Sequence, residues 1–271
     1  MSKPSVQSAS RVFSEDDGWR GDQPSLRVSP LTGYWKFESA FLQRRVSCEL
    51  DPRLRRPASC DQGFRTLGPP SRQRDLRRAL LEAGIQLARA GGPDAVVLRE
   101  ATRRAGVVPN AAYRHFASRW ELLQAVRSAA LSALAVAMET ELAKLPHGNS
   151  PADFARASLR AIGTAYLRFA QEETGLFWTA FAIPDETRGA PVPAKAGNSG
   201  LNPFQLLGAA LDRLVEAGVL PPERRPGSEY LAWSAVRGLA MLFTEGPLRR
   251  LTSAERDVIG QRLLDMVEKG L

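Results

Sequence analysis

Apolar residues recur at helical spacing along the chain from residue 72 onward. In the first such stretch, five apolar residues fall on one stripe of a helix: Leu76, Ala79, Leu80, Ala83 and Leu87. The same period predicts further helices over residues 98–105, 109–115, 119–145, 152–171, 176–183, 203–217, 228–245 and 253–269. No useful run alternates apolar and polar residues with a period of two, so the sequence predicts an all-α protein.

The first three predicted helices are closely spaced and lie within residues 72–116. A longer helix is followed by two short ones, and Gly106 breaks the chain between those two. Pro109 suits the first turn of the third helix, where its missing N–H costs nothing. Ser118 and Glu121 form a capping-box pattern at the start of the next, longer helix. These helix lengths and the break between the two short helices are typical of a helix-turn-helix unit, whose last helix enters the major groove of DNA.

The distribution of charge agrees with a DNA-binding head. The formal net charge is +8, yet it is spread unevenly along the chain. Residues 71–126 hold ten basic and five acidic residues, whereas residues 127–271 hold sixteen of each. A short basic segment beside a neutral one fits a head that binds DNA on a body with another task, and a solvated basic face is the alternative.

Residues 1–70 differ from the rest, because they contain scattered Pro, Gly, Ser and Arg without a sustained period. We interpret them as a disordered extension; an ordered arm, or sequence that precedes the true start of translation, is the alternative. The predicted organisation is this extension, a helix-turn-helix head over residues 71–120, and a helical ligand-binding and dimerisation body over residues 121–271.

Composition argues against several classes of function. The two cysteines and two histidines match no metal or redox spacing, and the body offers no convergent acid, base and nucleophile. We therefore expect no catalytic residues, no metal, no cofactor and no enzyme activity. Neither a secretory signal nor a run of eighteen apolar residues is visible, so we expect a cytoplasmic protein without a membrane partner.

Several fixed spacings together resemble the DNA-binding head of TetR-type repressors. The matching residues are Gly106-Val107, then Tyr113-Arg114-His115-Phe116, then Ser118-Arg119-Trp120-Glu121-Leu122-Leu123. The resemblance covers residues 74–126 without an insertion between Gly106 and Leu123. It implies a small DNA-binding head on a larger, all-helical body that senses a ligand and forms a dimer.

The resemblance also implies which residues contact DNA. Asn110 would look toward base edges, and it can make a bidentate contact, typically with adenine. Tyr113 and His115 match a pair that touches phosphate or base, and Arg119 matches a phosphate contact at a helix start. Arg114 would contact phosphate or face solvent. The expected DNA-binding set is Arg99, Pro109, Asn110, Ala111, Tyr113, Arg114, His115 and Arg119.

The head departs from the family pattern in its helix caps and in the packing of its second helix. Val97 and Val108 stand where the family usually has Thr or Ser, and a lost cap costs about 1 kcal/mol. Ala101-Thr102 replaces the usual Ile-Ala pair of the bracing helix. We expect these changes to loosen the head or to shift its sequence preference.

The body carries a group of aromatic residues at helical spacing, which usually means core but in this family commonly means a ligand pocket. Residues 232–240 are similar to a Trp–His–Gly signature of one TetR subgroup, with Arg237 in place of the His. Close helix packing around Trp233 accounts for this segment, and an anionic effector that Arg237 would contact is the other interpretation. The segment 184–202 is expected to be mobile. The candidate pocket consists of Tyr166, Phe169, Phe177, Trp178, Phe181, Trp233 and Arg237.

The function implied is a sequence-specific transcriptional regulator. We expect a homodimer, joined through helices 228–245 and 253–269, that a small-molecule effector of unknown identity releases from a palindromic operator in double-stranded DNA. The alternative is an effector-independent helix-turn-helix protein with an inert dimerisation body. An apolar pocket in the body would favour the first function, and a solid core would favour the second.

Overall fold

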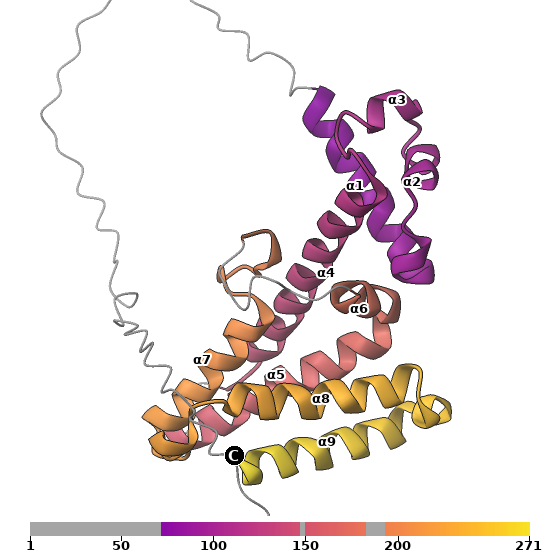
Figure 1. Ribbon diagram of the computed structural model, residues 1–271. Helices are drawn as coiled ribbons and strands as arrows, with labels where there is room; N and C mark the ends of the chain where they lie inside the picture. The colour runs from indigo at the N-terminus through magenta and orange to yellow at the C-terminus, as the bar shows by residue number, and fades with distance from the viewer. Residues whose placement is uncertain (1–71, 147–149, 183–192) are drawn as a thin grey trace, which may run out of the picture. The chain divides into compact units, whose positions relative to one another are not determined.

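The computed structural model describes residues 72–146, 150–182 and 193–271, which fold into α- and 3-10 helices without a strand in those ranges (Figure 1). The interpretation of residues 1–70 lies outside them. The α-helices are α1 (Arg72–Gly91), α2 (Leu98–Arg104), α3 (Pro109–Ala112), α4 (Arg119–Leu142), α5 (Pro151–Glu172), α6 (Thr174–Phe181), α7 (Pro203–Glu216), α8 (Ser228–Thr244) and α9 (Ser253–Gly270). The 3-10 helices are η1 (Pro93–Ala95), η2 (Pro193–Lys195), η3 (Pro222–Arg224) and η4 (Pro247–Arg250). The all-α prediction is confirmed.

The third predicted helix is shorter than expected. α3 ends at Ala112, and the chain continues as a turn in which the N–H groups of His115 and Phe116 both donate to the Ala112 carbonyl, at 2.9 and 3.0 Å. Phe116 is fully buried and holds this turn against the head, as its apolar character predicted. Periodicity alone could not separate a one-turn helix plus a turn from a two-turn helix.

The predicted capping box at the start of α4 is present in a modified form. The Ser118 hydroxyl accepts from the Glu121 N–H at 3.2 Å, whereas the Glu121 carboxylate accepts from the N–H of Ala117, one residue before the cap. Val97 is the N-cap of α2 and makes no side-chain capping bond, as predicted. α2 therefore begins without the side-chain acceptor that stabilises α4.

α4 links the head to the body, since it packs against α1 at its start and against α5, α6 and α7 further along. Head and body consequently belong to one compact unit, and the predicted boundary at residue 120 falls inside the first turn of α4. By length and composition alone, α4 is the one helix in the described ranges that could cross a membrane. Half of its most apolar window is buried by these neighbouring helices, which is how the core helix of a globular domain packs.

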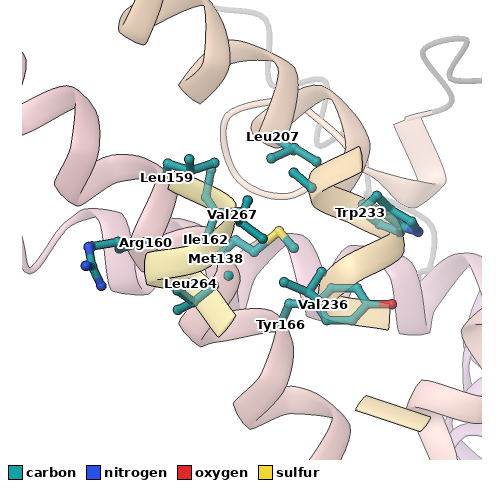
Figure 2. Close-up of a pocket in the computed structure, with 12 residues that line it drawn as sticks. Met138, Leu159, Arg160, Ile162, Tyr166, Leu207, Trp233, Val236, Leu264 and Val267 are labelled. Carbon is teal, nitrogen blue, oxygen red and sulfur yellow. The ribbon is translucent and has the colours of Figure 1, made fainter. Parts of the chain in front are cut away.

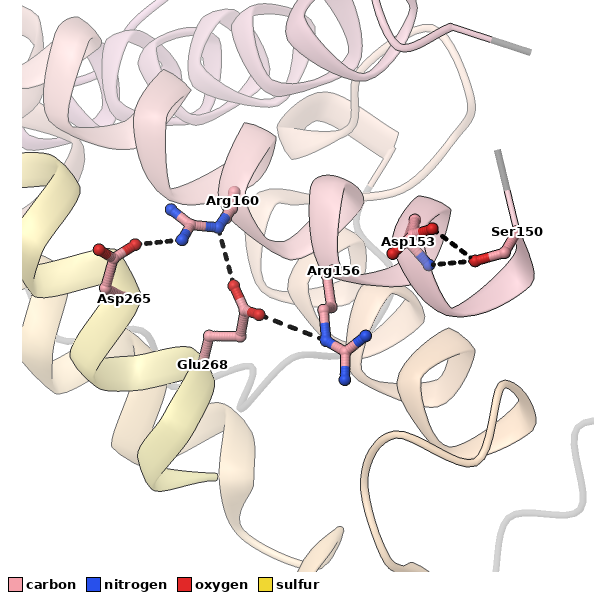
Figure 3. A network of polar contacts seen from close by, with 6 residues as sticks. All are labelled: Ser150, Asp153, Arg156, Arg160, Asp265 and Glu268. Atoms are coloured by element: carbon pink, nitrogen blue, oxygen red, sulfur yellow. Dashed lines mark hydrogen bonds and ion pairs between the residues drawn. The ribbon is translucent and has the colours of Figure 1, made fainter. Parts of the chain in front are cut away.

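In the body, α8 and α9 form an antiparallel hairpin that packs on α5 (Figure 1). Gly163 of α5 lies directly beneath Leu264 of α9, and a Cβ at this position would overlap the leucine side chain. Ion pairs fasten the same two helices: Arg160 pairs with Asp265 and, at 2.8 Å, with Glu268 (Figure 3). These contacts fix α9 against α5 and leave its other face exposed.

The segment over residues 184–202, expected to be mobile, is described only over residues 193–202, and this part is hydrogen-bonded to α4; its mobility stays a prediction. The Ser132 hydroxyl donates to the Ala196 carbonyl at 2.6 Å. The Glu139 carboxylate accepts from the N–H groups of Asn198 and Ser199, at 2.8 and 2.9 Å, and from the Ser199 hydroxyl. The Gly- and Pro-rich composition indicated a loop correctly, but it carried no information about these long-range bonds.

The hydrogen bonds from residues 198–199 to Glu139, which we call the Glu139 anchor, should weaken at acidic pH. Partial burial raises the pKa of Glu139, but the bonds from Ser199 and Asn198 outweigh it and hold that pKa below 4.5. The anchor therefore contributes its full stability above pH 4.5 and loses it as the pH falls through the lowered pKa. We expect Glu139→Gln to lower the free energy of unfolding at pH 7 by roughly 1 kcal/mol and by less at an acidic pH below the lowered pKa of Glu139. Urea unfolding at both pH values measures this difference, and Glu216→Gln, at an exposed position, is the control. An equal loss at both pH values would contradict the anchor.

Candidate DNA-binding surface and effector site

The head presents most of the predicted DNA-contacting residues to solvent. Asn110 on α3 is exposed, as are Tyr113 and Arg114 in the turn that follows, and the exposed fraction of Tyr113 is 58%. This exposure leaves the Tyr113 side chain accessible to DNA. Pro109 begins α3, Ala111 and His115 are half-buried, and Arg99 is exposed on α2. Their contacts with DNA stay predictions.

Arg119 has a structural role that the sequence did not indicate. Its Nε donates to the Val96 carbonyl at 2.8 Å and its Nη2 donates to the Pro93 carbonyl at 2.9 Å. Asp94 lies 3.7 Å from the same guanidinium. The side chain thus ties the start of α4 to the turn that precedes α2, and a phosphate contact would come in addition to this task.

The arginines of the head divide into those that pair with a carboxylate and those that do not. Glu100 accepts from Arg103 and Arg104, and these bonds lower the pKa of Glu100 to about 2, so its carboxylate stays charged and offsets both cations. Among the described residues, Arg99 and Arg114 form no ion pair with a carboxylate. These two arginines are therefore the better placed to meet phosphate oxygens.

Four of the predicted pocket residues form an aromatic cluster, which consists of Tyr166, Phe177, Phe181 and Trp233. The ring centroids of Tyr166 lie 5.5 Å from Phe177, 6.0 Å from Phe181 and 5.2 Å from Trp233. These are ordinary edge-to-face and tilted contacts, which stabilise a core as well as they line a site. The structure thus brings these four residues together from α5, α6 and α8, and their role as a ligand pocket stays a prediction.

The other predicted aromatic residues lie at the border of the cluster or outside it. Trp178 touches the cluster through Phe177, at 5.7 Å between ring centroids. Phe169 is buried, but it makes no ring contact with the cluster in the described part of the chain. Sequence reasoning missed Phe204 of α7, which packs on Trp233 at 5.7 Å and on Tyr230 at 5.5 Å. No local pattern marked Phe204, because only the fold brings α7 to α8.

Arg237 places a positive charge beside the cluster. Its guanidinium carbon lies 4.3 Å from the centroid of Phe181 and 5.8 Å from that of Phe177, which is cation–π geometry. Two polar atoms here are buried and lack a hydrogen-bond partner: Nη1 of Arg237 and the hydroxyl of Tyr166. Burial raises the pKa of Tyr166 to about 12, although the nearby Arg237 guanidinium acts to lower that pKa. The hydroxyl therefore keeps its proton.

A small cavity borders the cluster, and its volume is about 20 Å³. Tyr166 and Trp233 line it together with apolar residues of α4, α5, α7, α8 and α9 (Figure 2). The aliphatic part of the Arg160 side chain also lines the cavity, while its guanidinium points away from it (Figure 2). Such a volume holds about one water molecule, so the rings here pack as a nearly solid core.

α6 connects the aromatic cluster to the head. Phe177 and Phe181 belong to α6, and its first turn rests on the C-terminal end of α1. There Gly175 lies so close to the backbone carbonyl of Ala88 that a Cβ would overlap the oxygen. Arg89 of α1 pairs with Glu173 at 3.0 Å, just before α6. α6 and α1 are therefore in direct backbone contact at this point.

Comparison with known protein families identifies both parts of this arrangement. Residues 80–126 match the family model described as "Bacterial regulatory proteins, tetR family". Residues 159–267 match the model described as "Tetracyclin repressor-like, C-terminal domain". The comparison with curated proteins finds no match.

Several solved structures resemble this chain at low sequence identity. A protein of unknown function from Rhodococcus sp. RHA1 is 23% identical, with a TM-score of 0.52 over 78% of this chain and 99% of its own. RolR, solved with its ligand resorcinol, is 21% identical, with a TM-score of 0.48 over 72% and 88% of the two chains. The regulator PfmR from Thermus thermophilus is 22% identical, with a TM-score of 0.46 over 71% and 98%.

The two family matches and the helix-turn-helix head define a class, that of the DNA-binding transcriptional regulators. Within this class, the chain belongs to the TetR family. The sequence prediction of the family is confirmed, and it extends to a tetracyclin repressor-like C-terminal domain. The narrower similarity to the Trp–His–Gly signature stays a prediction, since the description of that domain does not mention it.

Proposed function

We propose that this regulator is a homodimeric repressor that an effector in its body releases from a palindromic operator. The observation that carries this proposal is the pair of buried polar atoms without partners, on Arg237 and Tyr166, in a cluster that shares α6 with the head contact. A buried polar group without a partner costs stability and therefore calls for an explanation such as a ligand. Arg237 stands at the position where the sequence left close helix packing and an anionic effector as the two interpretations.

The proposed dimer uses the exposed faces of α8 and α9. Leu231 is 64% exposed and Leu242 is 42% exposed, and Gly238 between them meets no neighbouring atom within 4 Å. α9 adds the exposed Val258 and Met266. Such an apolar face on two adjacent helices is typical of a subunit interface, and a two-fold axis would pair it with itself. Two heads on that axis would meet two half-sites of a palindrome.

The proposed release mechanism rests on the contact between α6 and α1. An effector that inserts among the rings of Phe177 and Phe181 would displace α6. Because Gly175 touches the backbone of α1, α1 would move with α6 and change the position of the head. The ligand would then favour a state whose two heads no longer fit successive major grooves.

An effector-independent DNA-binding protein is the second candidate. The cavity of about 20 Å³ favours it, because a solid core is what an inert body would have. The two candidates differ in one measurable property. A regulator with an effector loses operator affinity when that molecule is added, whereas an effector-independent protein holds its operator against every small molecule tried.

Base recognition by the head is tested by Asn110→Ala. We expect this change to weaken operator binding by roughly 1–3 kcal/mol and to relax the preference at one base pair, because a bidentate contact to a base edge is lost. Competition binding against operators substituted at single positions measures both effects. Asn198→Ala, an exposed amide in the body, is the control. An equal loss on every DNA sequence would assign Asn110 to the phosphate backbone instead.

A further inference from the structure

The cation of Arg237 has no anionic counterpart within the described residues. It stands over two aromatic faces, with one guanidinium nitrogen buried and unbonded. Arg237 as a whole is half-buried, and removing part of its guanidinium from water without an opposite charge is unfavourable. The side chain is therefore a poor choice for packing alone, and a good one for receiving an anion.

The hydroxyl of Tyr166 is the second unused group at the same place. Tyr166 is 1% exposed, and its ring touches Phe177 and Phe181, the same two rings that Arg237 covers. The hydroxyl is a neutral donor, and the guanidinium offers further donors in a planar fork that suits a carboxylate. Arg237 lies near enough to the Tyr166 hydroxyl to oppose the rise of its pKa, so the two groups stand at the same place among the rings. An acceptor with negative charge, carried by a flat apolar body, matches both donors and their surroundings.

We propose that Arg237 and Tyr166 form an anion site in the aromatic cluster, and that its ligand is an aromatic carboxylate. The carboxylate accepts from Arg237 and from the Tyr166 hydroxyl, and the ring packs against Phe177, Phe181 and Trp233. The cavity of about 20 Å³ holds one water molecule, so the ring must displace part of the cluster as it enters. The site deepens the proposed function and rests on it, because the displaced rings include those of α6.

The test measures binding by calorimetry to the full chain without DNA. The probes are benzoate and 1-naphthoate, with benzamide as the neutral counterpart, acetate as the anion without a ring, and inorganic phosphate as the other anion. We expect both aromatic carboxylates to bind, and the three comparison compounds to bind far more weakly. Arg237→Gln should weaken carboxylate binding roughly 10- to 100-fold, since a charged hydrogen bond is lost. Arg237→Lys should keep part of the affinity.

Stability of the free protein gives a second and independent measurement. Arg237→Met removes the unpaired charge and keeps an apolar stem, so we expect a melting temperature at or above that of the unsubstituted chain, together with loss of carboxylate binding. A melting temperature well below it would assign Arg237 to packing and overturn the proposal. Absence of binding by both aromatic carboxylates, or equal binding of benzamide, would also overturn it.

The anion site and the proposed repressor mechanism can fail separately. Carboxylates that bind without weakening the operator complex would leave the site standing and contradict effector-driven release. Release by some other compound, with no binding of carboxylates, would contradict the anion site alone. Arg237→Gln distinguishes these cases, because it should abolish release only if the anion acts through this side chain.

Discussion

Leu242→Glu should abolish tight operator binding while leaving the fold of each subunit intact. Leu242 lies on the exposed face of α8 and makes no contribution to the buried core. In a two-fold interface each substitution appears twice, so two carboxylates would be brought toward each other away from water, which is strongly unfavourable. A monomer reads one half-site, and we expect affinity to fall on the order of 10³-fold or more.

Analytical ultracentrifugation and operator binding, measured on the same sample, test this prediction. Leu242→Met is the matched control, because it keeps an apolar side chain of similar volume at the same position. The glutamate variant should sediment as a monomer with an unchanged helical circular dichroism signal. A variant that remains a dimer and keeps its operator affinity would show that the subunits meet through a different surface.

Gly175→Ala should have the second-largest effect, because it pushes the head and the body apart. The new Cβ would overlap the Ala88 carbonyl oxygen and stand 2.6 Å from that of Arg89, and these backbone atoms cannot rotate away as a side chain could. Overpacking of this kind typically costs about 1–3 kcal/mol. The chain can relieve it by displacing α1, the helix that also changes position in the proposed release mechanism.

The variant should therefore bind operator weakly even without an effector, and adding one should change little. Urea unfolding and operator titration measure the two consequences. Gly208→Ala is the control, since a Cβ there meets Arg225 at an ordinary 3.7 Å and the change should stabilise α7 slightly. Normal operator affinity in Gly175→Ala, with a normal response to effector, would show that α6 does not couple effector binding to the position of the head.

The sequence predicted those parts of the molecule that depend on local patterns. The helices follow from apolar spacing, and the head follows from the fixed distances between Gly106 and Leu123. The cap at Ser118 and the missing cap at Val97 were also readable, because capping involves residues three or four apart. Each of these features is decided within a few turns of the chain.

Features that depend on the fold could not be predicted in the same way. Arg119 binds carbonyls 23 and 26 residues away, and Glu139 binds a loop about 60 residues further along. Phe204 joins the aromatic residues only because α7 packs beside α8. The importance of Gly175 could not be predicted either, because a glycine near the start of a helix is common. Only the contact with the backbone of α1 requires a residue without a side chain there.

The most direct test of the account is binding of the full chain to DNA from immediately upstream of its own gene, measured at several salt concentrations and followed by a random-sequence selection. The regulator should form a tight complex that prefers a palindrome, weakens steeply with salt as phosphate contacts are screened, and loses its preference in Asn110→Ala. Binding that is no stronger than to random DNA, together with a selection that enriches no sequence, would contradict it.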